Sequence, residues 1–293
     1  MPGPTASTQT PKVSVVLQAA AASLAAAGVE SAQLDAQLLL AAAAGVDRAA
    51  LLSGSMNLSP ETLARFEAMM TRRRAREPVA YILGRREFYS LEFEVDREVL
   101  IARPHTETVV EVALEFIAGH PRARVLDIGT GSGAIAVALA ANAPQVSVVA
   151  TDIWPPALAL AGRNAASNKV AERIDFVTAD VFERLDAGPG LGKFDLVISN
   201  PPYIVDDQIA LLDPEVRNFE PRVALRGGPE GLDFFRRIAA CVRLHLERDG
   251  LLVLEVGAGQ DGAVAAILTA AGMQPAGVIK DLDGIARVVT ARP

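Results

Sequence analysis

The sequence predicts an α/β fold in which a small helical domain precedes a mostly parallel β-sheet covered by helices on both faces. Two observations support this prediction. Apolar residues in the first quarter of the chain recur at helical spacing, and from about residue 106 onward short apolar runs alternate with helical patterns. Such alternation is typical of a parallel sheet with helical crossovers. A chain of 293 residues is long enough for both parts.

The N-terminal part is predicted to contain helices that glycine and proline residues separate. The predicted helices span residues 13–27, 31–45, 48–53 and 61–76. Gly28 and Gly45 are natural C-caps, and Pro78 ends the last of these helices. We therefore expect residues 1–11 to be a disordered tail and residues 12–84 to be a helical domain.

The pattern changes after the last of these helices. Residues 87–101 alternate apolar and polar side chains, which predicts a β-hairpin or two short strands with a turn near residues 96–98. We expect residues 85–105 to form a hairpin linker between the helical domain and a second domain at residues 106–293.

The second domain is predicted to repeat a strand–helix unit. The predicted strands span residues 124–128, 146–151, 174–178, 194–199, 251–256, 274–279 and 286–291. The predicted helices span residues 106–118, 134–142, 156–167, 232–247 and 261–271. The last two strands are joined only by residues 280–285, which is too short for a parallel crossover, so we expect the last strand to be antiparallel.

Composition argues against several classes of protein. The net charge of −7 at pH 7 argues against a surface that binds nucleic acid by general phosphate neutralisation. The single cysteine, Cys241, excludes an internal disulfide framework, and the three histidines lack metal-type spacing, so we expect no metal site. No apolar run has the length of a membrane span and the N-terminus lacks signal-peptide features, so we expect a cytoplasmic protein without a membrane partner.

A glycine-rich loop follows the first strand of the second domain. Its residues are Asp127, Ile128, Gly129, Thr130, Gly131, Ser132 and Gly133. The third glycine comes one residue earlier than in the dinucleotide fingerprint, and an acidic residue precedes the first glycine by two positions. This is the pattern of methyltransferases that use S-adenosylmethionine (SAM), and we predict a SAM site here. The alternative is a plain glycine turn.

Further candidate SAM-binding residues follow the next two strands. Asp152 can accept hydrogen bonds from both ribose hydroxyls, although it could instead cap the helix that follows. Ile153 is assigned to the same site, and Trp154 either covers the adenine or packs internally. Asp180 and the backbone N–H of Val181 could meet the amino group and a ring nitrogen of adenine.

The fourth strand is followed by Asn200, Pro201, Pro202 and Tyr203. Two prolines keep the chain stiff and extended, which leaves the Asn200 side chain and the Pro201 carbonyl as acceptors. Two acceptors can orient a planar –NH2 group toward a methyl sulfonium and stabilise the positive charge that develops on its nitrogen. Tyr203 can stack on the planar group. We predict that these four residues are catalytic and bind the substrate, with Asn200 also beside SAM; the alternative is an ordinary rigid turn.

The glycine loop and this tetrapeptide together resemble N-methyltransferases that act on planar amines. Further stretches resemble the HemK-like release factor glutamine methyltransferases: EPVAYILG at residues 77–84, REFY at 86–89, VLIARPHTE at 99–107, NFEP at 218–221 and GGPEG at 227–231. The family pattern at 101–107 is usually Ile-Pro-Arg-Pro-Glu/Asp-Thr-Glu. Here Ala102 and His105 depart from it, whereas Arg103 and Glu107 match.

The resemblance covers almost the whole chain and has specific implications. It implies a Rossmann-like, seven-stranded SAM-dependent methyltransferase sheet and an N-terminal helical domain that recognises the substrate. It also implies methyl transfer from SAM to the side-chain amide nitrogen (N5) of the glutamine in the Gly-Gly-Gln motif of peptide chain release factors. Arg103 would be a substrate-binding residue, and the enzyme would be a cytoplasmic monomer that binds no nucleic acid stably.

Other interpretations remain open at this stage. The same tetrapeptide would suit a glutamine of another protein, such as a ribosomal protein, or the N6 amine of adenine in nucleic acid, although the acidic composition disfavours adenine. A SAM-dependent binding or assembly protein without catalytic activity is disfavoured by the intact tetrapeptide. The run of Arg72, Arg73, Arg74 and Arg76 either complements a helix dipole or meets an acidic partner. The long segment 204–229 is expected to border the substrate groove.

Overall fold

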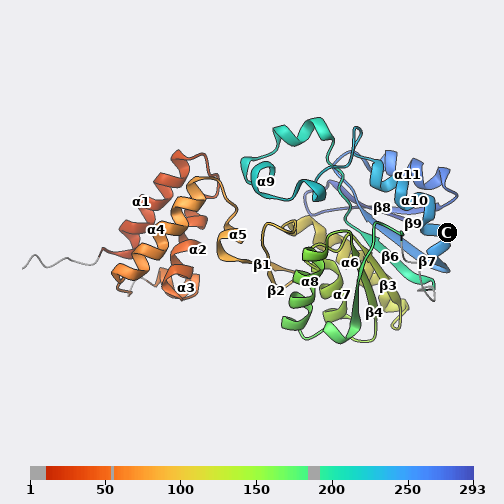
Figure 1. The fold of residues 1–293 in the computed structure, drawn as a ribbon, viewed down its shortest axis with the longest axis horizontal. Helices are drawn as coiled ribbons and strands as arrows, with labels where there is room; N and C mark the ends of the chain where they lie inside the picture. Colours follow the sequence, from red (N-terminus) through yellow and green to blue (C-terminus); the bar gives the residue numbers. More distant parts are fainter. Residues whose placement is uncertain (1–10, 54–55, 184–191) are drawn as a thin grey trace, which may run out of the picture. The chain divides into compact units, whose positions relative to one another are not determined.

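The structure is a computed structural model that describes residues 11–53, 56–183 and 192–293. Residues 1–10, which include nearly all of the predicted tail, lie outside the described part. The chain divides into two compact units, one ending at Gly84 but including Pro214–Phe219, the other formed by Arg85–Asp213 and Glu220–Pro293 (Figure 1). The sequence-based boundaries assign Pro214–Phe219 to the second domain, whereas its contacts group it with the first unit.

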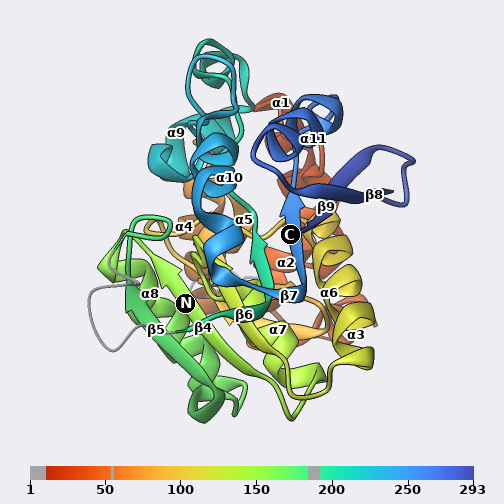
Figure 2. The ribbon, with the colours of Figure 1, turned by 90° about the vertical axis from the view of Figure 1, so that its right-hand side faces the viewer.

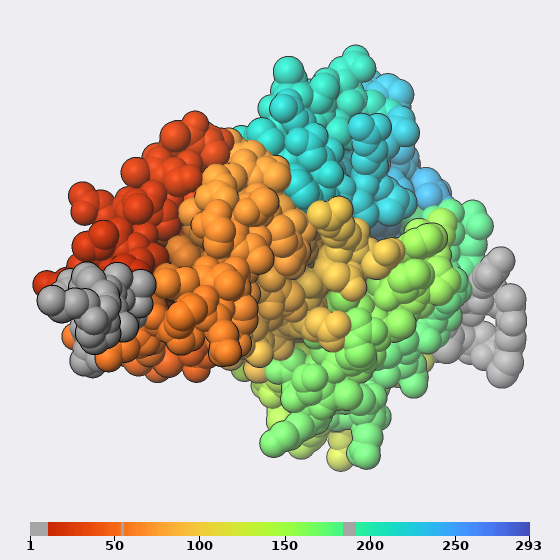
Figure 3. All heavy atoms as spheres, turned by 60° about the vertical axis from the view of Figure 1, so that its left-hand side comes forward, coloured from red at the N-terminus to blue at the C-terminus, as the bar shows by residue number. Residues whose placement is uncertain are grey.

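The first unit consists of helices. They are α1 (Val13–Ala26), α2 (Ala32–Ala44), α3 (Arg48–Leu52), α4 (Pro60–Arg74), α5 (Val79–Leu83) and α9 (Pro214–Phe219). Helix α4 begins at a cap in which Ser59 Oγ accepts a 3.1 Å hydrogen bond from the backbone N–H of Thr62. Helices α1 and α4 pack together, and Figure 3 shows their red and orange atoms side by side at the surface. Helix α5 was not expected, because five residues are too few to show a periodic pattern.

The arginine run at the end of α4 is engaged in ion pairs within this unit. Arg73 is buried, and its Nε lies 2.7 Å from Asp35 Oδ2. Arg73 and Arg76 also bind Glu215 of α9, at 2.9 and 2.6 Å. The other two members pair with acidic residues of the same unit, Arg72 with Glu77 and Arg74 with Glu67. The run is therefore part of the internal structure of the unit, and Glu215 attaches α9 to it.

The second unit begins with a hairpin of β1 (Arg85–Phe88) and β2 (Leu91–Glu94), which pair antiparallel. Its turn is Tyr89–Ser90. The predicted turn near residues 96–98 exists, since the carbonyl of Asp96 accepts a hydrogen bond from the N–H of Val99, but it follows β2 and does not join the two strands. Both residues of the hairpin turn have positive φ, 51° and 59°, as a two-residue hairpin turn requires. Glycine and asparagine usually mark such turns, and their absence here removed the signal from the sequence.

The sheet of this unit contains seven strands. They are β3 (Arg124–Ile128), β4 (Ser147–Asp152), β5 (Ile174–Thr178), β6 (Phe194–Ser199), β7 (Leu246–Glu255), β8 (Gln274–Lys280) and β9 (Ala286–Arg292). Their spatial order is β5-β4-β3-β6-β7-β9-β8. Among the described strands of this sheet, β9 alone runs in the opposite direction, antiparallel to both β7 and β8, as expected for the last strand. The predicted α/β fold class is confirmed.

Helices cover both faces of this sheet. On one face lie α6 (Glu107–Gly119), α7 (Ala134–Asn142) and α8 (Pro155–Ser167); on the other lie α10 (Asp233–His245) and α11 (Asp261–Ala270) (Figures 1 and 2). Short 3-10 helices are η1 (Pro104–Thr106), η2 (Ala171–Arg173), η3 (Asp206–Leu211) and η4 (Arg222–Ala224). In the described ranges no helix combines the length and apolar character that crossing a membrane requires.

The order of the strands determines where a ligand can bind. Strand β3 pairs with β4 on one side and with β6 on the other, and all three are parallel. The chain runs from β3 outward to β4 and β5 and then crosses back to β6 on the other side of β3. This change of direction opens a crevice at the carboxyl ends of the strands. Ser199 joins the two strand ends at this point, because its Oγ donates a 2.7 Å hydrogen bond to the carbonyl of Ile128. The glycine loop and the Asn200 tetrapeptide both leave the sheet here.

Candidate active site

The glycine loop after β3 forms one wall of a pocket at this crevice. Gly129, Gly131 and Gly133 have φ of 72°, 54° and 79°, a region that residues with a Cβ rarely adopt. Gly129 and Gly131 line the pocket, and a Cβ on either would meet no atom within 4 Å, so the space beside them is open. Gly133 is different, because its Cβ would lie 3.0 Å from Ala161 Cβ. It permits close packing of α7 against α8.

Thr130, Ser132 and Asp127 lie behind this wall. All three are buried, and none lines the pocket. Thr130 Oγ1 donates a 2.7 Å hydrogen bond to Asp127 Oδ2, and the carbonyl of Ser132 accepts one from Asn164. In the described part of the chain, Asp127 Oδ1 has no hydrogen-bond partner. Burial raises the pKa of this carboxyl group to about 7, although the Thr130 hydroxyl and the nearby backbone N–H of Ala136 favour its charged form. A buried carboxyl group with an unpartnered oxygen fits a cationic ligand such as the α-ammonium group of SAM.

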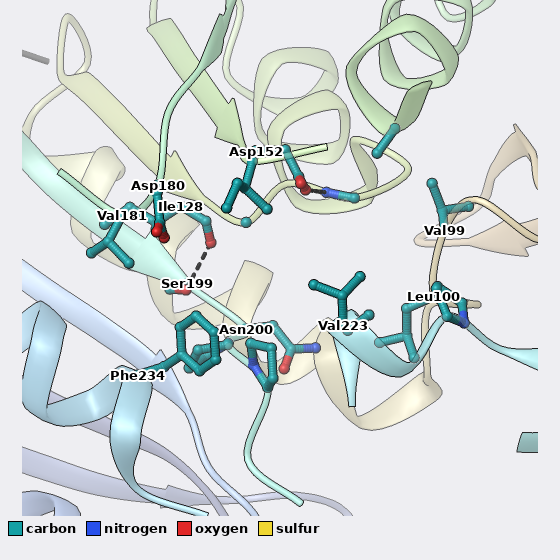
Figure 4. A pocket seen from close by; sticks show the side chains of 18 of the residues that line it. Val99, Leu100, Ile128, Asp152, Asp180, Val181, Ser199, Asn200, Val223 and Phe234 are labelled. Carbon is teal, nitrogen blue, oxygen red and sulfur yellow. Dashed lines mark hydrogen bonds between the residues drawn. The ribbon is translucent and has the colours of Figure 1, made fainter. Parts of the chain in front are cut away.

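Asp152 lines the pocket from the end of β4 (Figure 4). Its Oδ2 accepts a 2.9 Å hydrogen bond from the N–H of Gly131, and its Oδ1 accepts one of the same length from Trp154. Each oxygen keeps a second lone pair, which suits ribose hydroxyls. The alternative role as a helix cap is not observed, because Trp154 occupies the N-cap position of α8. Burial raises the pKa of Asp152 as well.

The residues that follow Asp152 are arranged differently. Ile153 lines the pocket, whereas Trp154 is not part of the lining. The indole Nε1 of Trp154 instead donates a 2.7 Å hydrogen bond to Glu98 Oε2, and Glu98 itself lines the pocket. The structure therefore places Ile153, not Trp154, where it could contact an adenine.

Asp180 and Val181 line the same pocket after β5 (Figure 4). Asp180 Oδ1 lies 2.7 Å from a guanidinium nitrogen of Arg237. Val181 is buried and has φ of 56°, a backbone conformation that is strained for a β-branched residue. Strain of this kind persists only where the surrounding structure imposes it, and here it lies at the wall of the pocket.

Three further parts of the second unit complete the pocket: the linker after the hairpin, the loop with η4, and α10. They contribute Glu98, Val99, Leu100, Pro221, Val223, Ala224, Phe234 and Ile238 (Figure 4). The sequence reasoning did not identify these residues individually. Helical spacing on α10 predicts only core positions, while the linker and loop residues lie in or beside stretches that the family resemblance had marked.

Asn200, Pro201 and Pro202 line the pocket next to Gly129 and Asp152. The side-chain amide of Asn200 uses its nitrogen as a donor to Thr106 Oγ1, at 3.4 Å. Among the described residues, Asn200 Oδ1 accepts no hydrogen bond and is available to a ligand. Thr106 thereby orients the Asn200 amide and leaves its oxygen without a partner. The structure places this oxygen, the predicted acceptor, at the same pocket as Gly129 and Asp152.

Tyr203 lies just behind this lining and is held closely by its surroundings. Its carbonyl accepts a 3.0 Å hydrogen bond from Gln260 Nε2, and its hydroxyl donates a 3.4 Å one to Glu255 Oε1. A Cβ on Gly231 would lie 2.4 Å from that carbonyl, and one on Gly227 would lie 2.8 Å from the Tyr203 backbone. These contacts explain Gly227 and Gly231 of the GGPEG stretch, whereas a Cβ on Gly228 would collide with the Asp233 side chain. Burial raises the pKa of the Tyr203 hydroxyl.

Arg103, the predicted substrate residue, is not part of the pocket lining. One of its guanidinium nitrogens lies 2.6 Å from Oε1 of Glu220, a buried residue. Burial raises the pKa of Glu220, and the positive charge of Arg103 opposes that shift. Arg103 therefore joins the segment before α6 to the loop after the tetrapeptide.

Comparison with known proteins identifies the family. One family model, described as the PrmC N-terminal domain, matches residues 16–84, and another, the Methyltransferase small domain, matches residues 106–212. A release factor glutamine methyltransferase of Cereibacter sphaeroides is 46% identical over 277 residues, which cover 94% of this chain and 96% of that protein. Similarly named proteins of Geobacter sulfurreducens (44% identical, 92% of both chains) and Agrobacterium fabrum (39%, 96% and 97%) also match.

Solved structures support the fold. The catalytic domain of hMettl16 in complex with a 3′UTR hairpin aligns with a TM-score of 0.57 and 18% identity, over 82% of this chain and 84% of that one. This likeness shows the methyltransferase fold alone, whereas the relatives align over nearly their whole length. The chain therefore belongs to the release factor glutamine methyltransferase family, and it is a methyltransferase that uses S-adenosylmethionine as its methyl donor.

Proposed function

We propose that this enzyme methylates the side-chain amide nitrogen (N5) of the glutamine in the Gly-Gly-Gln motif of peptide chain release factors. The observation that carries the proposal is the position of Asn200. Its unused acceptor oxygen lies at the carboxyl end of β6, beside the pocket wall formed by Gly129 and Asp152. The names of the relatives support release factors as the class of substrate.

The chain's own residues can hold the cofactor. Asp152 would accept hydrogen bonds from the ribose hydroxyls, and Ile153, Asp180 and Val181 would border the adenine. Asp127, buried behind the glycine loop, would offer its unpartnered Oδ1 to the α-ammonium group. Bound SAM supplies an electrophilic methyl group on its sulfonium. The open space beside Gly129 and Gly131 allows close approach of the ligand to the backbone.

The tetrapeptide orients the acceptor amide. Asn200 Oδ1 and the Pro201 carbonyl accept hydrogen bonds from the two amide hydrogens, so that the nitrogen faces the methyl group. Both dipoles stabilise the positive charge that develops on nitrogen as the bond forms, and the product then releases a proton to solvent. Tyr203 supports the plane of the amide. The scheme requires no strong base, because positioning and electrostatic stabilisation supply the rate enhancement.

The remaining proposals concern partners and location. We propose that the helical unit recognises the body of the release factor, and that the enzyme acts as a cytoplasmic monomer. The net charge of −7 supports a protein substrate over stable binding of nucleic acid. Sedimentation analysis with and without RNA tests the oligomeric state and the absence of stable RNA binding.

Labelled SAM and a purified release factor test the function, with mass spectrometry to locate the methyl group. We expect a single methylation on the motif glutamine and none on a factor whose glutamine is replaced by glutamate. Asn200→Ala should lower turnover by about a hundredfold through lost orientation. Methylation that persists without the motif glutamine, or transfer to a ribosomal protein or to adenine in RNA alone, would overturn the substrate assignment.

A further inference from the structure

We propose that Glu255 is a positioning residue for methyl transfer: its buried carboxylate holds the hydroxyl of Tyr203, and His105 packs against the same carboxylate. The proposal deepens the proposed function and rests on it, because Tyr203 matters only if the tetrapeptide binds the acceptor amide. All three residues belong to the second unit. They come from three separate parts of the chain, namely the end of β7, the loop after β6, and η1.

Glu255 is fully buried at the last position of β7. Its Oε1 lies 3.4 Å from the Tyr203 hydroxyl and 3.2 Å from His105 Nε2. The imidazole approaches at an ion-pair distance but without the direction of a hydrogen bond. Within the described ranges Oε2 has no partner. Burying a carboxylate costs free energy unless it is paired, and the two contacts to Oε1 offset part of that cost.

Tyr203 is anchored at its two ends by different groups. Its backbone is held by Gln260 and by the close approach of Gly231, as described above. Gly257 leaves room for the ring, because a Cβ there would lie 3.0 Å from Tyr203 Cδ2. Within the described part of the chain, the hydroxyl end is hydrogen-bonded by Glu255. Glu255 therefore determines the orientation of the ring, while the backbone contacts determine its position.

His105 is the second side chain that lies against Glu255. Its Nε2 is 3.2 Å from Glu255 Oε1. An acidic side chain at position 105 would place a second carboxyl group beside Glu255, whereas a histidine adds no negative charge there. The histidine therefore spares the buried carboxylate, on which Tyr203 depends, a neighbour of like charge.

The consequence for catalysis is specific to the acceptor amide. Tyr203 is not part of the pocket lining, whereas Asn200, Pro201 and Pro202 are. Because Tyr203 is outside the lining, a rotated ring would leave the pocket wall at Gly129 and Asp152 unchanged. Under the proposed function it would disturb the support of the acceptor amide. Loss of Glu255 should lower kcat and leave the affinity for SAM as it is.

The test combines fluorine NMR with kinetics. The chain has 3 tyrosines, Tyr81, Tyr89 and Tyr203, so the protein labelled with 3-fluorotyrosine should give three resolvable signals, of which Tyr203→Phe removes one. Glu255→Gln keeps an acceptor for the hydroxyl, and Glu255→Ala removes it. Glu247→Gln, an exposed position on the same strand, is the matched control. Affinity for SAM and the midpoint of thermal unfolding show that each variant is folded.

We expect Glu255→Ala to move or broaden the Tyr203 signal and to lower kcat about tenfold, with Glu255→Gln within about threefold of the wild type. Tyr203→Phe and the double variant should each lose about as much as Glu255→Ala alone, since both changes remove one contact. An unchanged signal and kcat in Glu255→Ala, or losses that multiply in the double variant, would overturn the proposal. If the wild type does not methylate a release factor, the proposed function fails, while the NMR result still decides whether Glu255 holds Tyr203.

Discussion

The pH dependence of SAM affinity should report the ionisation of Asp127. Burial raises the pKa of this carboxyl group to about 7, although the Thr130 hydroxyl donates to it and favours the charged form. Its Oδ1 has no partner in the described residues, and we expect the α-ammonium group of SAM to lie there. The ammonium group binds a carboxylate in preference to a carboxylic acid. Binding below pH 7 must therefore release a proton from Asp127.

The magnitude follows from the ionised fraction of Asp127. With a pKa of about 7, roughly half of the carboxyl groups are charged at pH 7 and about a tenth at pH 6. The Kd for SAM should therefore rise about fivefold over that interval and approach a tenfold rise per pH unit below it. Isothermal titration calorimetry measures the Kd, and buffers of different ionisation enthalpy count the released protons, about 0.5 at pH 7 and about 0.9 at pH 6.

Asp127→Asn is the matched control, because asparagine still accepts from Thr130 and cannot ionise. It should bind SAM more weakly, with a Kd that is constant over this pH range. A wild-type Kd for SAM that does not change between pH 6 and pH 7, or an equal pH dependence in Asp127→Asn, would refute the reasoning.

Asp127→Asn, which should weaken SAM binding, should raise the free energy of unfolding of the protein without SAM. The folded pKa of Asp127 lies above the value of 3.8 for an unperturbed aspartate. Its favourable contribution is therefore complete below about pH 4 and lost as the pH rises to about 7. At pH 8, Asp127→Asn should exceed the wild type in the free energy of unfolding by up to about 4 kcal/mol, and the two should agree near pH 4, as urea denaturation can measure.

Three further predictions concern single contacts. Thr106→Val removes the partner of the Asn200 amide and should lower kcat about tenfold with an unchanged Kd for SAM, whereas Thr106→Ser should recover most of the rate in the same assay. Gly231→Ala forces a Cβ against the Tyr203 carbonyl at φ of 72° and should lower the free energy of unfolding by about 2 kcal/mol or more, measured with urea. Glu215→Ala removes the carboxylate that attaches α9 and should cost about 2 kcal/mol in the same measurement, with Glu215→Gln less affected.

The strands and the cofactor loop could be predicted because their signals are local. Short runs of mainly apolar residues marked β3, β5 and β6, and three glycines at alternate positions marked a turn that needs positive φ. The candidate acceptor residues could be predicted for the same reason, since Asn200 follows a buried strand directly. In each case one short stretch of sequence carries both the geometry and the chemistry.

The features that the sequence did not predict depend on tertiary contacts. The turn at Tyr89 and Ser90 adopts positive φ without glycine or asparagine, so local propensity pointed to a later turn. Helix α9 joins the helical unit through Glu215, which only the fold brings to Arg73 and Arg76. Likewise, nothing in the sequence indicated that Arg103 pairs with Glu220, and its role in binding the substrate stays a prediction.

The side-chain contacts of residues 103–107 indicate what this stretch does in the fold. Its members share one property, which is that each contacts a different part of the second unit. Arg103 pairs with Glu220, His105 lies against Glu255, Thr106 accepts from Asn200, and Glu107 accepts a 2.9 Å hydrogen bond from the N–H of Tyr89 in the hairpin turn. None of these four residues lines the candidate cofactor pocket. We conclude that the stretch organises the acceptor site, because it connects the hairpin, β7, the tetrapeptide and the loop that follows it through single side-chain contacts.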